Sequence, residues 1–389
     1  MRTCDFLPRL KRFFSGALAC AFVSVSASLA RAEIHIGVAV QKAGSFSSLS
    51  EQIITGARFA ADEINASGGL LGESVAIDVV DDGCDGETAK NVANQLVGKG
   101  VVAVIGHLCD RASIEAAGVY ATNGIVQISP SAENPAFTEN RPLPGGGTYR
   151  LAPRNTAQNE RLLDFIRQAA NGGKIAIVDD GSVYGKSLTE PLISGLKAAD
   201  LNPVLTASFE SGEERYRSLS GRIVDSGARV VVIGATHRDI AVLVRDIDRL
   251  SLKPTIVGGD AMVHPEFPVL VLDGNTARTD LDRLYAAFPI DPRTLPSARD
   301  ARAALAEKGL SAAGLTLRGH AAMTILADAL KKAGKADFAA LNQVLSTTTF
   351  TTALGAVAFD AKGDATIPFY AMHKWQGETI VPINKVAPW

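Results

Sequence analysis

The sequence has 389 residues, of which 47% are hydrophobic and 21% are charged, and its formal net charge is -2. This balance leaves no basic excess of the kind that nucleic-acid-binding proteins carry, and after the amino-terminal segment no apolar run reaches the length of a membrane-spanning helix. A chain of this length exceeds what a single hydrophobic core normally serves, so we expect two domains.

The amino-terminal segment has the pattern of an export signal. Four basic residues precede an apolar stretch, Phe13–Val25, and Ala30 and Ala32 supply the small residues that signal peptidase requires. We therefore predict that residues 1–32 are a cleaved signal peptide and that the mature protein is periplasmic. Removing five basic residues and one acidic residue would make the chain about four charges more negative. A run that resembles a lipobox before Cys20 leaves a lipid anchor open as the alternative.

The first half of the mature chain alternates short apolar runs with helical spacings of apolar residues. Predicted strands are 34–40, 75–80, 101–105 and 125–128, and predicted helices lie near 49–64, 89–98 and 110–123. Strands that alternate with helices indicate a parallel sheet, whose ligands collect at the carboxyl ends of its strands. Polar residues follow three of these strands, at 82–85, 107–110 and 129–133.

A glycine- and proline-rich segment at 141–147 predicts the first domain boundary, because the same alternation restarts after it. Predicted strands of this second series are 174–178, 204–209, 230–233 and 255–257, with polar ends at 179–184, 235–237 and 259–260. Further on, helical patterns cover 297–308, 318–333 and 338–345, and hairpin pieces cover 351–359 and 369–375 with a turn at 360–364. The second series therefore presents polar residues along one sheet edge as well.

Two cysteines, Cys84 and Cys109, remain after the predicted cleavage. In an oxidising compartment such a pair most simply forms a disulfide, which is worth about 3 kcal/mol for a loop of this length in the chain-entropy model. The bridge would join the loops after two adjacent strands and stiffen one wall of a ligand crevice. A metal or redox site is the alternative, but neither cysteine has a CxxC or CxxxH partner, so we predict no metal.

Several short motifs occur in the same order as in a known family. They are NASGGLLG at 65–72, DGCD at 82–85, VIGHLC at 104–109, ISPSA at 128–132, the segment 175–185 and FDAKGD at 359–364. With them the mature chain resembles the leucine/isoleucine/valine-binding proteins of bacterial ABC importers. That resemblance implies an α/β fold of two Rossmann-like lobes with parallel sheets, joined by three hinge strands, as in type I periplasmic binding proteins. Lobe 1 would comprise residues 33–153 and 290–369, and lobe 2 residues 154–289 and 370–389.

The same resemblance implies which residues hold an amino-acid ligand when the lobes close. The implied ligand-binding positions are Asp110, Ser131, Ala132, Glu133, Tyr184, Thr236 and Asp260. The first four would hold the carboxylate of the ligand, and Asp260 would receive its ammonium group.

Three positions depart from the family pattern. Asp110 and Glu133 stand where the family has a neutral donor and a threonine, and the aromatic side chain expected near Leu49 is missing. A crevice with up to three carboxylates and no matched arginine would disfavour an anionic ligand, unless Arg111 or Arg154 turns inward. Asp110 could instead cap the following helix or pair with Arg111, and Glu133 could face solvent.

These features favour an extracytoplasmic solute-binding protein that captures a small amino-acid-like ligand and delivers it to the membrane permease subunits of an ABC importer. The alternative is a periplasmic sensing receptor for an amide, amine or aromatic acid with no transport role. An enzyme is disfavoured because no GxSxG, HExxH or phosphate-binding glycine motif occurs, and no cofactor or nucleic-acid partner is expected. We expect His107 and His237, which follow predicted strands, to be structural.

Overall fold

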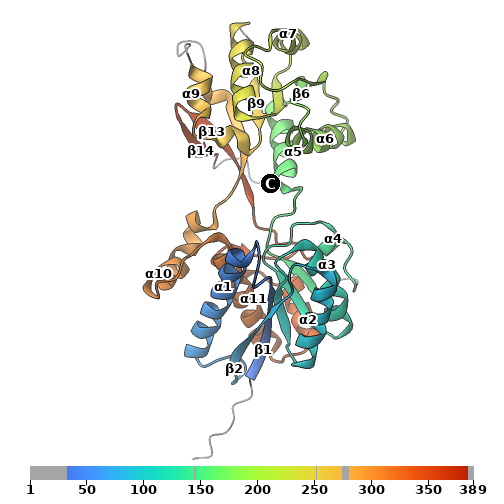
Figure 1. The fold of residues 1–389 in the computed structure, drawn as a ribbon, viewed down its shortest axis with the longest axis vertical. Coiled ribbons are helices and arrows are strands. Elements are labelled where there is room, and N and C mark those ends of the chain that lie inside the picture. The colour runs from blue at the N-terminus through green and yellow to red at the C-terminus, as the bar shows by residue number, and fades with distance from the viewer. Residues whose placement is uncertain (1–32, 144–145, 251, 274–279, 384–389) are drawn as a thin grey trace, which may run out of the picture. The chain divides into compact units, whose positions relative to one another are not determined.

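The computed structural model describes residues 33–143, 146–250, 252–273 and 280–383 (Figure 1). The predicted signal peptide and Cys20 lie outside the described residues. The described chain forms two lobes, each built around its own sheet. We call lobe 1 the sheet of strands β1–β5 with the elements packed on it, and lobe 2 the sheet that contains β6–β10, β13 and β14.

Lobe 1 has five parallel strands in the order β2-β1-β3-β4-β5. They are β1 (Glu33–Val40), β2 (Ser74–Asp81), β3 (Ala103–Gly106), β4 (Val126–Ser129) and β5 (Thr148–Arg150). The first four agree with the predicted strands within two residues, whereas β5 was missed because three residues carry no periodic signal. β3 and β4 are buried along their whole length, since helices cover both faces of the sheet.

Helices α1 (Ser47–Ala66) and α11 (Gly314–Ala333) share one core with this sheet, and α2 (Gly86–Gly98) and α3 (Asp110–Thr122) form the core on the other side. α1 and α11 approach closely because glycines face the neighbouring backbone. A Cβ atom added at Gly56 would lie 2.0 Å from the carbonyl oxygen of Thr316. The α11 segment is therefore part of the lobe that the amino-terminal elements begin.

Short elements complete lobe 1: α4 (Ala136–Glu139), η3 (Pro292–Thr294), η4 (Pro296–Ala298), α10 (Arg299–Glu307), α12 (Phe338–Thr347), β11 (Phe350–Thr352) and β12 (Gly355–Val357). The predicted strand at 351–359 is wrong in one respect, because a turn at Ala353 and Leu354 folds it into the β11–β12 hairpin. Gly355, with a positive φ of 101°, allows the chain to leave that turn. The predicted turn at 360–364 is confirmed by the hydrogen bond from the Asp360 N–H group to the Asp364 carbonyl oxygen.

Lobe 2 has seven strands in the order β14-β13-β10-β9-β8-β6-β7. They are β6 (Ile175–Asp179), β7 (Leu205–Ser208), β8 (Val230–Gly234), β9 (Thr255–Gly258), β10 (Leu284–Pro289), β13 (Tyr370–Gln376) and β14 (Thr379–Pro382). β7, β6, β8, β9 and β10 run parallel, while β13 and β14 add an antiparallel hairpin at one edge.

Helices again cover both faces of the lobe 2 sheet. α5 (Ala157–Ala170) and α6 (Val183–Ala198) share one core with it, and α7 (Arg217–Ser226), α8 (His237–Arg249) and α9 (Phe267–Leu272) share the other. Two short 3-10 helices, η1 (Asp260–Val263) and η2 (Leu281–Arg283), follow β9 and precede β10. The predicted α/β class with parallel sheets in two lobes is therefore confirmed.

The chain passes between the two sheets three times. It leaves lobe 1 after β5, returns to it after β10, and enters lobe 2 again at β13. Figure 1 follows these crossings by colour, from green through orange to red. The sequence-based lobe boundaries at 153/154, 289/290 and 369/370 stay a prediction.

Candidate functional site

The disulfide ties together two of the polar strand ends in lobe 1. Cys84 and Cys109 are bonded, with their Cα atoms 5.4 Å apart, which confirms the predicted pairing. We expected the two cysteines to follow adjacent strands, but β1 lies between β2 and β3. The bridge therefore spans the carboxyl end of β1 and fixes the entry to α3, where Asp110 begins the helix.

His107 is a buried structural residue, as predicted. Its Nδ1 atom lies 2.6 Å from an Asp82 carboxylate oxygen and its Nε2 atom lies 3.0 Å from the Tyr120 hydroxyl. Burial, with a smaller contribution from the charge of Asp82, raises the pKa of Tyr120 well above its usual value. Both ring nitrogens of His107 are engaged inside the lobe, directly after β3. His107 therefore offers no free nitrogen to a ligand.

The Asp110 side chain organises the loop that follows β4. Its Oδ1 atom accepts the backbone N–H groups of Glu133 at 2.6 Å and Asn134 at 3.0 Å. This arrangement matches neither a cap of its own helix nor a pair with Arg111, the two alternatives considered from the sequence. The carboxylate instead closes a short bridge between the β3 end and the β4 end.

The other predicted positions on this loop differ in what they present. Ser131 donates its hydroxyl to the carbonyl oxygen of Leu108 at 2.7 Å, and Ala132 is fully buried with its N–H group bonded to Ser129. Glu133 is exposed, although partial burial of its carboxyl group raises its pKa, an effect that Arg318 opposes and Asp110 adds to. Of these positions, only Glu133 carries an exposed side chain, and ligand contact at each of them stays a prediction.

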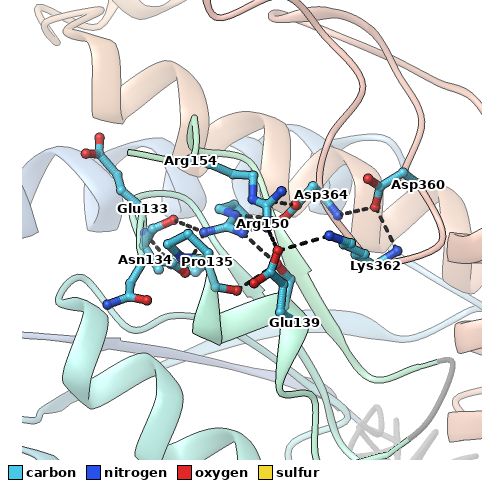
Figure 2. Close-up of polar contacts among 12 residues, drawn as sticks. Glu133, Asn134, Pro135, Glu139, Arg150, Arg154, Asp360, Lys362 and Asp364 are labelled. Atoms are coloured by element: carbon cyan, nitrogen blue, oxygen red, sulfur yellow. Dashed lines mark hydrogen bonds and ion pairs between the residues drawn. The ribbon is translucent and has the colours of Figure 1, made fainter. Parts of the chain in front are cut away.

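A buried arginine holds this loop from behind (Figure 2). The Arg150 side chain is fully buried and bonds the Asp364 carboxylate at 2.8 and 2.6 Å, together with the carbonyl oxygen of Asn134 at 2.8 Å. Arg154 contacts both Glu139 and Asp364, so its charge is also used within lobe 1. Figure 2 shows the Glu133 carboxylate pointing away from this cluster. Of the two arginines that the sequence left open, Arg154 is therefore engaged by carboxylates of its own lobe, and an inward turn of Arg111 stays a prediction.

Sequence reasoning missed Arg318, near the start of α11. It is half-buried, its Cζ atom lies 6.0 Å from the centre of the Phe369 ring, and its charge acts on the carboxyl group of Glu133. The sequence interpretation named only Arg111 and Arg154 as possible cations for the site and overlooked Arg318. The available signal was a cation on an otherwise apolar helical face, since Ala321, Ala322 and Ile325 follow it at helical spacing.

In lobe 2, three predicted residues line one cavity of about 620 Å³ at the carboxyl ends of the strands. The cavity is lined by Asp180, Ser182, Tyr184, Ser211, Thr236, His237, Asp260, Ala261, Val263, His264 and Phe288. The Tyr184 hydroxyl donates to Asp260 Oδ1 at 2.8 Å and accepts the N–H group of Ala261 at 3.3 Å. Burial, together with the neighbouring charge and hydrogen bond of Asp260, raises the pKa of Tyr184, so its hydroxyl stays protonated.

Thr236 is the amino-terminal cap of α8. Its hydroxyl donates to Asp239 Oδ2 at 2.7 Å and accepts the Asp239 N–H group at 3.3 Å. Asp239 also accepts hydrogen bonds from Ser211 and Tyr216 at 2.5 and 2.6 Å. Thr236 is therefore positioned at the cavity by a buried network, with part of its hydroxyl capacity already used.

Two histidines form part of the same wall. The His237 and His264 rings are stacked, with centres 4.0 Å apart and planes 15° apart, and His237 Nε2 lies 3.6 Å from a Glu266 oxygen. These three residues could offer a metal three ligand atoms, but the lone pairs of stacked rings do not converge on one point. Glu266 is also paired with Arg238 at 2.8 Å. From the sequence we expected a purely structural role for His237, but in the structure it lines the cavity.

The sequence of residues 33–378 matches the family described as periplasmic binding protein. The chain belongs to the periplasmic binding protein family. It is 31% identical to a Leu/Ile/Val-binding protein homolog of Brucella abortus, over 94% of this chain and 96% of that protein. It is 32% identical to an amino acid binding protein of Pseudomonas aeruginosa, also over 94% of this chain and 96% of that protein. A solved ABC transporter substrate-binding protein from Desulfitobacterium hafniense shares the fold, with a TM-score of 0.61 and 22% identity over 90% of this chain and all of that one.

Membership of the periplasmic binding protein family places this chain in a family of extracytoplasmic solute-binding proteins. Within the described residues, no helix is long and apolar enough to cross a membrane. The carboxyl ends of the strands in both lobes therefore form the natural candidate for the solute site of this periplasmic binding protein.

Proposed function

We propose that this periplasmic binding protein captures an amino acid between its two lobes and hands it to the permease subunits of an ABC importer. The observation that carries the proposal is the hydrogen-bonded pair of Tyr184 and Asp260 on the cavity wall of lobe 2. Two relatives that are at least 31% identical over 94% of this chain are named for binding Leu/Ile/Val and amino acids, which supports the same class of ligand here. Residues 1–32 would direct export, and no reaction on the ligand is expected.

Asp260 is suited to receive the ammonium group of an amino acid. It is exposed at the start of η1, and Tyr184 orients one of its oxygens. Within the described part of the chain, no hydrogen bond engages the second oxygen, which leaves it free to accept from a ligand. A charge-assisted hydrogen bond between an ammonium and a carboxylate is roughly twice as strong as a neutral one.

Apolar side chains near the strand ends could accommodate the ligand side chain. Phe288 of β10 is 36% exposed on the cavity of lobe 2, while Phe46 and Leu49 at the start of α1 are 44% and 38% exposed in lobe 1. Large apolar groups are usually buried, so their exposure at strand ends favours a ligand with an apolar portion. The absence of an aromatic at Leu49 is thus partly offset by Phe46, three residues earlier.

The importer interpretation fits better than the sensing receptor, because the relatives over nearly the whole chain are named as binding proteins for amino acids. Uptake of radiolabelled amino acids by a deletion strain of the source organism, with and without the restored gene, tests transport. Loss of uptake that the gene restores is expected. Normal uptake in the deletion strain, combined with a lost transcriptional response to the ligand, would favour the sensor.

Binding is tested by calorimetry with the twenty amino acids on the wild type and on Asp260→Asn. The substitution keeps the shape of the side chain and removes its charge, so affinity should fall by about 10- to 100-fold, the effect of losing one charge-assisted bond. Asp300→Asn is the matched control, since Asp300 is exposed on α10 and paired with Arg299. Equal affinities of wild type and Asp260→Asn would refute the assignment of the ammonium to Asp260.

A further inference from the structure

Lobe 1 contains an anion position that the protein fills with its own carboxylate. Two backbone N–H groups, of Glu133 and Asn134, converge on Asp110 Oδ1 at 2.6 and 3.0 Å. Adjacent N–H groups that point at one spot are a common receptor for a negatively charged oxygen. A ligand carboxylate could bind these two N–H groups only by displacing Asp110. We therefore expect another group of lobe 1 to bind the ligand carboxylate.

The described residues of lobe 1 include an arginine that is placed for this purpose. Arg318 is half-buried, and within the described chain no carboxylate lies within 4.0 Å of its guanidinium and no hydrogen bond engages it. Arg150 and Arg154, by contrast, are both bonded to Asp364. The Phe369 ring contacts the guanidinium but supplies no negative charge. Burial of a cation without an anionic partner is unfavourable, and a structure that keeps such a group commonly uses it.

Arg318 belongs to the same group of charges as the predicted ligand loop. The charges of Arg318 and Asp110 both act on Glu133, and that of Arg318 also acts on Tyr370, the first residue of β13. Burial lowers the pKa of Arg318, an effect that Glu133 only partly opposes. The guanidinium lies 6.0 Å from the ring of Phe369, the residue directly before β13, and its charge reaches the carboxyl group of Glu133 in the loop after β4.

We infer that Arg318 is the residue that receives a carboxylate of the ligand in lobe 1, in place of the backbone donors that Asp110 has taken. This inference rests on the proposed function and assigns the residue of lobe 1 that binds the carboxylate of the amino acid. A planar guanidinium binds a carboxylate through two parallel hydrogen bonds, which a neutral donor cannot do. The ligand would then join Arg318 of lobe 1 to Asp260 of lobe 2, so each lobe holds one charge.

A different role for Arg318 would be to neutralise Glu133. The two roles predict different behaviour when Glu133 also loses its charge. If Arg318 serves only Glu133, the double variant Arg318→Gln/Glu133→Gln should bind as the wild type does. If Arg318 binds the ligand, the double variant should stay as weak as Arg318→Gln alone.

The test is calorimetry with three amino acids and their amides: leucine and leucinamide, phenylalanine and phenylalaninamide, and alanine and alaninamide. Amides keep the ammonium group and remove the carboxylate. The wild type should prefer an acid over its amide by about 10- to 100-fold, and Arg318→Gln should lose this preference by weakening the acid alone. Arg318→Lys should recover part of the loss, because it restores the charge without the bidentate geometry.

The matched control is Arg299→Gln on α10, an exposed arginine paired with Asp300, which should change nothing. Equal binding of acid and amide by the wild type, or an unchanged affinity of Arg318→Gln for the acids, would overturn the inference. Rescue of Arg318→Gln by Glu133→Gln would overturn it as well. Failure of the proposed function looks different, because Asp260→Asn would then leave the affinity for both acids and amides unchanged.

Discussion

The disulfide between Cys84 and Cys109 should contribute most of its stability through the unfolded chain. The two cysteines are 25 residues apart, and the chain-entropy relation converts a closed loop of that length into about 3.5 kcal/mol at 25 °C. The double variant Cys84→Ser/Cys109→Ser should therefore unfold at a melting temperature that is roughly 7 to 14 °C lower, at 2 to 4 °C per kcal/mol for a lobe of this size.

Differential scanning calorimetry of the wild type and the double variant, each with and without a reductant, measures this effect. The reductant should lower the melting temperature of the wild type and leave that of the double variant unchanged, which makes the variant its own control. Ligand affinity should change less than stability, because the bond from Asp110 to the loop after β4 does not depend on the bridge. A difference of less than about 2 °C would refute the entropic reasoning.

Two further predictions concern one lobe each. Gly56→Ala should destabilise lobe 1 by about 3 kcal/mol or more in denaturant unfolding, since the new Cβ atom would lie 2.0 Å from the Thr316 carbonyl oxygen. Gly118→Ala is the control and should be neutral or stabilise α3, because its Cβ atom would have no neighbour within 4 Å. Equal effects of the two substitutions would contradict the packing argument. Burial alone would raise the pKa of Asp239, but hydrogen bonds from Ser211 and Tyr216 outweigh it and hold the pKa below 3.8. Because the pKa of Asp239 is lower in the folded state than in the unfolded chain, its ionised carboxylate stabilises the folded state above pH 3.8, and this stabilisation is lost as the pH falls through 3.8 and below. The free energy of unfolding of lobe 2 should therefore fall less steeply with decreasing pH in Asp239→Asn. An unchanged pH dependence would speak against this reasoning.

The hydrogen bonds of Arg150 connect the loop after β4 to a turn far away in the sequence of lobe 1. This residue comes from β5, a strand of three residues, and its guanidinium links the loop at Asn134 to the turn at Asp364 (Figure 2). The turn lies a few residues before the crossing into β13. Arg150 therefore links the loop after β4 to the segment that leads into the third crossing.

Much of the fold followed from local patterns in the sequence. The alternation of apolar runs with helical spacings predicted four strands of lobe 1 within two residues, because buried parallel strands are continuous apolar runs bounded by polar ends. The pairing of Cys84 with Cys109 followed from the number of cysteines that remain after the predicted cleavage. Tyr184, Thr236 and Asp260 meet in one cavity because each follows a parallel strand of the same sheet, a relation that topology alone imposes.

Only the tertiary structure decided how the charges of lobe 1 are used. The sequence showed Asp110 and Glu133 as two unbalanced carboxylates, but it could not show that Asp110 accepts two N–H groups from a loop 23 residues later. Nor could it bring Arg318 close to them, since α11 returns to lobe 1 after the whole of the second series of strands. Electrostatic interactions depend on the distance between the charges and on their burial. For Arg318 both are set only when α11 packs into lobe 1.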